Sequence, residues 1–137
     1  SWITLRREIE LTEQYLRIEQ VRFGARLGLD VHVDPDTADT LVPPLLLQPL
    51  VENAVRHGVA TLIEGGTIGV DTRRAGDRIV VTVSNPRDVD AQRRGTGLGL
   101  DIVRRRLAAT FGDRAALTVE PLTDTFRAQL TVPVEEA

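Results

Sequence analysis

Three amino acids are missing from this chain of 137 residues: cysteine, methionine and lysine. Without cysteine the chain can form neither a disulfide nor a thiolate metal site. Without lysine it cannot hold a nucleotide through a P-loop, because that motif requires the pattern G-x-x-x-x-G-K. Without methionine it has no start residue of its own, so we expect the chain to be part of a longer protein.

Long apolar runs and an excess of positive charge are absent as well. No run approaches the roughly 18 apolar residues that a membrane-spanning helix needs, and no signal-peptide pattern opens the chain. The formal net charge is −3, which gives no support for nonspecific binding to nucleic acid. With 42% hydrophobic and 27% charged residues, the chain has the composition and the length of one globular domain.

The spacing of apolar residues predicts an alternation of helices and strands. Over residues 3–23, the positions Leu5, Ile9, Thr12, Leu16 and 19–21 lie three to four apart, which predicts a helix. Residues 27–33 alternate strictly between apolar and polar, which is typical of a half-buried strand. The same reasoning predicts helices over 43–57 and 98–111 and strand pairs over 67–73 with 78–84 and 117–120 with 126–134. This order predicts an α/β fold, a two-layer sandwich whose mixed, mostly antiparallel sheet carries helices on one face.

The helix predicted over residues 43–57 has polar side chains beside its apolar stripe. Asn53 and His57 are four residues apart and share a face, and Glu52 and Arg56 form a second such pair. Mg²⁺ prefers oxygen ligands and keeps several waters, so the Asn53 carboxamide together with phosphate oxygens is a sufficient set. Arg56 and His57 would then meet the phosphate charge. The alternative is that Glu52 and Arg56 form a surface ion pair while Asn53 bonds a loop.

A second motif, Gly95-Thr96-Gly97-Leu98-Gly99-Leu100, stands at the start of the helix predicted over residues 98–111. Glycine lets the backbone come close to an anion, and the unpaired N–H groups at the start of a helix favour phosphate. A dinucleotide fingerprint reads G-x-G-x-x-G, whereas the spacing here is G-x-G-x-G without a parallel strand–helix–strand unit around it. The loop is therefore either a phosphate-binding element or a flexible connection.

In order and wording these pieces resemble the histidine-kinase, gyrase and Hsp90-like ATPases over about residues 25–134. More narrowly, they resemble bacterial sensor histidine kinases of the autolysin-regulator type. Residues 43–54, Pro-Pro-Leu-Leu-Leu-Gln-Pro-Leu-Val-Glu-Asn-Ala, match the Asn box of that branch almost letter for letter. The upstream helix has the motif Leu16-x-x-Glu19-x-x-Arg22-Phe23 of that branch, and residues 102–107 after the glycine loop also fit the pattern of the branch.

The resemblance implies a Bergerat-type ATP-binding fold with ATP and Mg²⁺ as cofactors. Asn53 would be the metal ligand, and Arg56 and His57 would lie along the phosphates or the ribose. The glycine motif from Gly95 to Leu100 would line the phosphate end of the site, with residues 86–95 as a short ATP lid.

Two positions depart from the family's pattern. The Asp-x-Gly-x-Gly box, whose carboxylate accepts a hydrogen bond from the adenine amino group, is replaced here by Ser84-Asn85-Pro86-Arg87. Asn85 is expected to accept that bond without charge assistance, so ATP is expected to bind more weakly. Pro49 stands one turn before Asn53, where many relatives carry a polar residue. Glu52 is expected to take over the catalytic role of that polar residue.

The activity that the resemblance implies is transfer of the γ-phosphoryl group of ATP to a histidine. His32 falls on a predicted strand and His57 in the ATP site, so the acceptor is expected on an upstream segment outside this chain. Residues 1–24 are expected to be a connecting helix from the missing dimerisation and phosphoacceptor region, and residues 25–137 the ATP-binding catalytic domain. The expected partners are those upstream helices and a response regulator, with no nucleic acid. The domain is expected to be cytoplasmic, within a protein of the bacterial inner membrane that reaches the membrane only through its missing segments.

Two other functions stay open. A degenerate nucleotide-sensing or docking module without kinase turnover is favoured by Pro49, Asn85 and Pro86. An ATPase or serine kinase such as an anti-sigma factor is permitted by the fold alone, although the wording around Glu19 and Arg22 argues against it. The basic clusters at residues 93–94 and 104–106 would contact phosphate and a partner domain respectively, or else are solvated surface charge.

Overall fold

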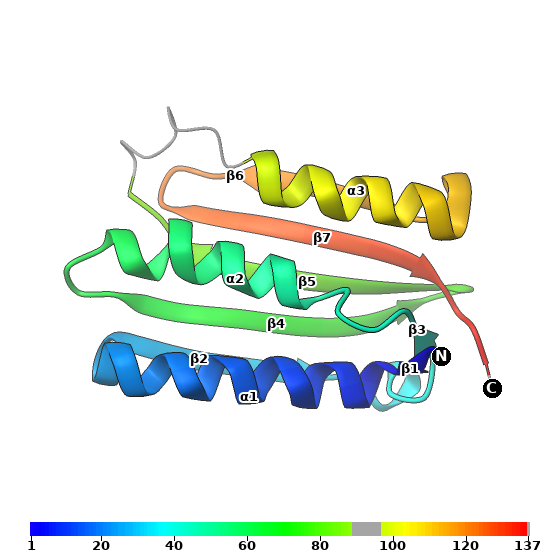
Figure 1. The fold of residues 1–137 in the computed structure, drawn as a ribbon, viewed down its shortest axis with the longest axis horizontal. Coiled ribbons are helices and arrows are strands. Elements are labelled where there is room, and N and C mark those ends of the chain that lie inside the picture. Colours follow the sequence, from blue (N-terminus) through cyan, green and yellow to red (C-terminus); the bar gives the residue numbers. More distant parts are fainter. Residues whose placement is uncertain (89–96, 137) are drawn as a thin grey trace.

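The computed structural model describes residues 1–88 and 97–136, and within these ranges a layer of helices packs on one sheet (Figure 1). The sheet in the described part has five strands in the spatial order β2-β4-β5-β7-β6. Their bounds are β2 Leu27–Val33, β4 Gly66–Ala75, β5 Arg78–Pro86, β6 Ala116–Pro121 and β7 Thr125–Pro133. β2 runs parallel to β4, and the other neighbouring strands are antiparallel. The predicted mixed, mostly antiparallel sheet is thus confirmed.

The helices α1 (Leu5–Phe23), α2 (Gln48–His57) and α3 (Gly97–Phe111) cover one face of this sheet, as predicted (Figure 1). α2 lies in the middle and contacts both α1 and α3. The inward faces of the helices and the alternating residues of the strands form one hydrophobic core. Among the described residues, no helix is both long and apolar enough to cross a membrane.

α1 belongs to this core along most of its length. Leu5, Ile9, Thr12 and Leu16 are buried, as their spacing predicted. Val21 was expected on the same face but is 88% exposed, because five residues after Leu16 a helix has turned well past its buried side. The predicted division at residue 24 concerns the longer protein and stays a prediction.

The segment before α2 differs from the prediction. α2 begins at Gln48 and not at residue 43, and residues 43–47 form an irregular turn that we call the entry turn. Leu45 has a φ of 62°, a left-handed conformation that an α-helix cannot contain. A two-stranded antiparallel pair of β1 (Ile3–Thr4) and β3 (Leu41–Val42) was also not predicted, since two residues are too few to show an alternating pattern.

Candidate functional site

α2 carries the predicted site residues on two different flanks. Its buried stripe packs on β4 and β5 and consists of Leu50, Val51, Ala54 and Val55. Because an α-helix has 3.6 residues per turn, Asn53 and His57 lie on one side of this stripe and Glu52 and Arg56 on the other. The two pairs expected from their spacing therefore face different neighbours.

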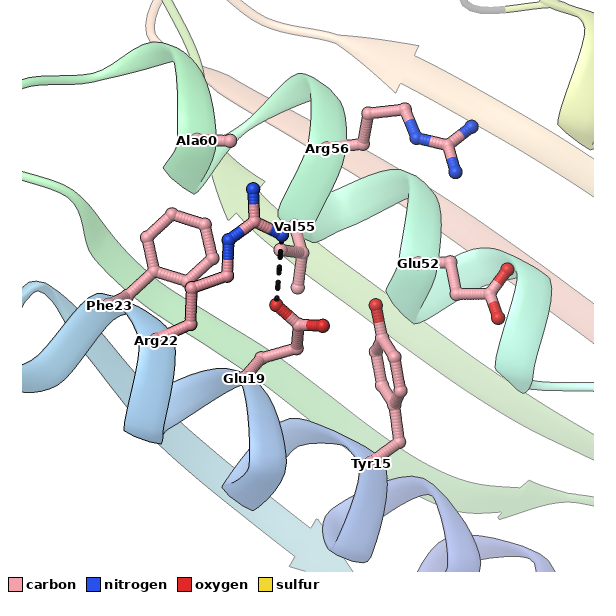
Figure 2. A pocket seen from close by; sticks show the side chains of 8 residues that line it. All are labelled: Tyr15, Glu19, Arg22, Phe23, Glu52, Val55, Arg56 and Ala60. Carbon is pink, nitrogen blue, oxygen red and sulfur yellow. Dashed lines mark ion pairs between the residues drawn. The ribbon is translucent and has the colours of Figure 1, made fainter.

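Glu52 and Arg56 line a cleft of about 230 Å³ between α2 and α1 (Figure 2). Glu52 Oε1 accepts a hydrogen bond from Gln48 Nε2 at 3.2 Å. In the described part of the chain no ion pair joins Glu52 to Arg56. The alternative of a simple Glu52–Arg56 surface pair is thus not what the structure contains, and the catalytic role expected for Glu52 stays a prediction.

The other wall of the cleft comes from α1 and includes the polar residues of its sequence motif. Figure 2 shows the Tyr15 hydroxyl pointing between Glu19 and Glu52. Burial, and then the negative charges of Glu19 and Glu52, raise the pKa of Tyr15 above its ordinary value, so the hydroxyl stays neutral. Glu19 Oε2 is buried without a hydrogen bond and has an ion pair with Arg22 Nη1 at 3.7 Å. Three residues of the motif Leu16-x-x-Glu19-x-x-Arg22-Phe23, namely Glu19, Arg22 and Phe23, therefore line the cleft between α1 and α2.

The opposite flank of α2, with Asn53 and His57, is turned toward α3, because α1 occupies the Glu52 side. Burial, and then the positive charge of Arg56, hold the pKa of His57 below its ordinary value. His57 is therefore neutral at pH 7 and offers one donor and one acceptor nitrogen. The described residues contain no cluster of three potential His, Cys, Asp or Glu ligands. A metal ion at Asn53 would thus take its remaining ligands from phosphate and water, which suits Mg²⁺.

Asn85 lies at the end of β5 and is only 4% exposed. Its Nδ2 donates to the Pro86 carbonyl oxygen at 2.9 Å, and the amide abuts Gly58, the residue that ends α2. Among the described residues Oδ1 accepts no hydrogen bond, so it remains an acceptor for an amino group. Tertiary structure has brought the end of α2 to the predicted adenine position, 27 residues away in sequence.

The glycine motif is described only in part. Gly95 and Thr96 lie outside the described residues, as do most of the expected ATP lid and Arg93 and Arg94. Residues 97–99 form the first turn of α3, whose N–H groups have no partner within the helix. Leu100 is buried in the core, so its side chain anchors α3 and only its backbone could face a phosphate. The start of α3 is thus suited to bind an anion.

The arginines at 104–106 differ from each other. Arg104 Nε donates to the Leu117 carbonyl oxygen at 3.4 Å, and Arg106 Nη1 donates to the Leu45 carbonyl oxygen at 2.7 Å. Neither is a freely solvated charge, whereas Arg105 is exposed. The sequence reading also missed Glu8, a buried carboxylate that accepts two backbone N–H groups. Its position three residues after Leu5 and one before Ile9, on the buried side of α1, was the signal that could have revealed it.

Comparisons with known proteins agree with this geometry. Residues 39–136 match the family model of the histidine kinase-, DNA gyrase B-, and HSP90-like ATPases. The chain is 31% identical over 135 residues to the sensor histidine kinase BtsS of Escherichia coli K12, covering 97% of this chain and 24% of that protein. It is 32% identical over 131 residues to the sensor protein LytS of Staphylococcus haemolyticus, covering 86% of this chain and 22% of that protein. The chain thus spans about a quarter of the length of these curated relatives.

Solved structures show the same fold at low sequence identity. The catalytic domain of histidine kinase ThkA superposes with a TM-score of 0.74 at 14% identity, covering 98% of this chain and 97% of that one. ThkA in complex with the response regulator protein TrrA superposes with a TM-score of 0.67 at 20% identity, covering 98% of this chain and 41% of that one. Together, the fold, the residues around α2 and the matching family model establish that this chain belongs to the histidine kinase-, DNA gyrase B- and HSP90-like ATPase family.

Proposed function

We propose that this chain is the catalytic ATP-binding domain of a two-component sensor histidine kinase. The observation that carries the proposal is the arrangement around α2. Asn53 is on the flank toward α3, and α2 ends against Asn85, the expected adenine acceptor. The domain would bind Mg²⁺-ATP and transfer its γ-phosphoryl group to a histidine on another segment of the longer protein.

Each part of the site would hold a different part of the nucleotide. Asn85 Oδ1, which accepts no hydrogen bond from the described residues, would accept the hydrogen bond of the adenine amino group. Gly58 leaves room for the Asn85 amide at the end of α2. The outward N–H groups in the first turn of α3 would bind phosphate. Asn53 would hold Mg²⁺ beside the neutral His57. Arg56, expected from the resemblance to lie along the phosphates, is on the other flank of α2, in the cleft toward α1, and is not assigned to them. Mg²⁺, when bound, neutralises phosphate charge and orients the terminal phosphoryl group.

The transfer breaks the bond between the γ-phosphorus and its bridging oxygen and forms a bond to an imidazole nitrogen. ADP leaves, and the imidazole loses its proton. The residues of this chain contribute by positioning and charge, since phosphoryl transfer needs little covalent help from the protein. His32 is exposed on β2, the edge strand at the opposite side of the sheet from β6. His57 lies within the site. We therefore place the acceptor histidine outside this chain.

The partners follow from this proposal. The phosphoacceptor and dimerisation helices of the longer protein would present the acceptor to the ATP site. A response regulator would then take the phosphoryl group, and ThkA, a kinase of the same fold, has been solved in complex with one. We further propose that the domain lies on the cytoplasmic side of a membrane-anchored sensor, where ATP is available.

A second candidate function is a nucleotide-sensing or docking module without turnover. Two observations favour it: a neutral Asn85 stands where the family has a charged carboxylate, and Pro49 removes a polar side chain one turn before Asn53. A neutral acceptor forms a hydrogen bond roughly half as strong as a charged one. Nucleotide affinity would therefore be lowered in either function, and only turnover separates them.

Calorimetric titration with ATP, in Mg²⁺ and in excess chelator, tests the site. We expect Mg²⁺ to strengthen ATP binding, and we expect Asn53→Ala to remove that gain and lower the affinity in Mg²⁺ by about tenfold or more. Gln14→Ala, an exposed residue of α1, is the matched control and should bind as the unchanged chain does. Absence of binding at millimolar nucleotide would contradict the proposal. A longer chain that binds Mg²⁺-ATP yet never forms phosphohistidine would favour the docking module.

A further inference from the structure

The entry turn, residues 43–47, is held by hydrogen bonds to a carboxylate from α1. Glu8 is 1% exposed. Its Oε1 accepts the Leu45 N–H at 3.0 Å, and its Oε2 accepts the Leu47 N–H at 2.8 Å. Both oxygens of one buried carboxylate are therefore used on a single turn of backbone, 37 and 39 residues away in sequence.

This carboxylate lies just ahead of α2, a helix without a side-chain cap of its own. Leu47, at the N-cap position of α2, has no side chain that can cap the helix, and Pro49 in the first turn has no N–H of its own. A negative charge at the start of a helix also interacts favourably with the helix dipole. Glu8 thus fixes the N-cap residue Leu47 from another helix by accepting its N–H, and its negative charge lies near the start of α2.

The same turn is gripped from the other side by α3. Arg106 Nη1 donates to the Leu45 carbonyl oxygen at 2.7 Å, and Nη2 donates to the Pro44 carbonyl oxygen. Leu45, whose left-handed φ of 62° is unfavourable for a residue with a side chain, therefore has its N–H bound by α1 and its carbonyl bound by α3. Local backbone preferences would not select this conformation. The hydrogen bonds with Glu8 and Arg106, which are distant in sequence, therefore maintain it.

The turn leads directly into the helix that carries Asn53, while Arg106 is on the helix whose first turn is proposed to bind phosphate. We propose that Glu8 and Arg106 are positioning residues that clamp the entry turn and thereby fix α2 at the spacing from α3 that Mg²⁺-ATP requires. Neither residue touches the nucleotide. The proposal rests on the proposed function, because Asn53 and the first turn of α3 must bind the same Mg²⁺-ATP for their spacing to matter.

The test is the gain in ATP affinity that Mg²⁺ provides, measured as the ratio of the dissociation constants in chelator and in Mg²⁺. A residue with a merely structural role would alter both constants together and leave this ratio unchanged. A positioning residue would lower the ratio, because the metal connects Asn53 on α2 with phosphates on α3. The thermal unfolding of each variant is recorded, and binding is measured well below its transition.

Glu8→Gln is the sharpest variant. Its single carbonyl oxygen can accept only one of the two N–H groups, and its NH₂ would then face the other donor. Glu10→Gln, on the exposed side of the same helix, makes the same chemical change and is the matched control. Arg106→Lys loses the forked pair of donors but keeps the charge, and Arg17→Lys on α1 is its control.

We expect Glu8→Gln and Arg106→Lys each to lower the Mg²⁺ ratio by about tenfold while the control variants keep it. The double variant should lose less than the product of the two single losses, because both residues hold the same turn. If Glu8→Gln fails to fold, Glu8→Asp, which keeps the charge on a shorter side chain, is used with Arg106→Lys. An unchanged ratio in folded variants would overturn the clamp. A ratio of one in the unchanged chain would instead overturn the proposed function.

Discussion

Replacing Gly58 with alanine should disturb the adenine end of the site from the end of α2. Gly58 has a φ of −112° and a ψ of −91°. A methyl group there would lie 2.8 Å from Asn85 Cγ and 2.5 Å from the Ala54 carbonyl oxygen. Real Cβ atoms essentially never come within 3.0 Å of such neighbours, so the Asn85 amide or the end of α2 must move by about 1 Å.

The size of the effect follows from how Asn85 is held. The amide is buried, and its Nδ2 is bonded to the Pro86 carbonyl oxygen, so it cannot turn away freely. Overpacking of this kind lowers stability by about 1–3 kcal/mol. If Asn85 Oδ1 withdraws from the adenine amino group, the lost hydrogen bond is worth about 0.5–1.5 kcal/mol, which corresponds to a roughly two- to tenfold weaker affinity for ATP.

The assay compares ATP with inosine triphosphate, which has a carbonyl oxygen in place of the adenine amino group. The unchanged chain should prefer ATP, and Gly58→Ala should reduce that preference. Gly69→Ala is the control. Its methyl group would come too close only to the Ser84 hydroxyl, at 2.7 Å, which can rotate away on the sheet face opposite the helices; the Asp30 carbonyl oxygen, at 3.9 Å, is an ordinary contact. Full ATP affinity with an unchanged preference in folded Gly58→Ala would refute the assignment of Asn85 to adenine.

Two further predictions concern protonation and the core. Because burial and the charge of Arg56 hold the pKa of His57 below 6.5, the unfolded chain takes up this proton first as the pH falls. The free energy of unfolding should therefore decrease as the pH falls from 6.5 to the folded pKa. Urea titrations at several pH values should show that His57→Gln removes this decrease and that His32→Gln does not. An equal pH dependence in all three chains would contradict the prediction. Leu16→Ala should lower the free energy of unfolding by about 2–5 kcal/mol because Leu16 is fully buried, whereas Ile18→Ala, at a side chain that is 69% exposed, should change it by about 0.5 kcal/mol or less. A small effect of Leu16→Ala would show instead that α1 is only a connecting segment.

Much of the fold could be predicted because its signals are local. The alternation of residues 27–33 and the helical spacing of residues 5–16 identify elements directly from the sequence, since the period of a side-chain pattern reports the backbone geometry. The strand pairs closed by Gly76 and by residues 122–124 were predicted for the same reason. The start of α2 was placed five residues too early, because the conformation of Leu45 depends on bonds to α1 and α3.

The candidate site, too, could be predicted from the sequence only in its local features. That Asn53 and His57 share a flank follows from a spacing of four residues, and that a glycine motif opens α3 is visible in the letters. The roles of Leu100 and Arg106 were not visible. Whether a side chain on α3 faces a ligand, a core or a backbone carbonyl depends on which neighbour covers each side of the helix.

The sequence by itself determined the identity and order of the elements, the family resemblance, and the pairing of side chains along each helix. These properties depend on residues within one or two turns of each other. Tertiary structure alone decided that Glu52 faces Tyr15 across a cleft, that Gly58 meets Asn85, and that Glu8 and Arg106 grip one turn from opposite sides. Each of these contacts joins segments that come together only when the apolar faces of α1, α2 and α3 are buried on the same sheet. A local sequence pattern shows which face of a helix is apolar, but it does not show which residues of another element that face will meet.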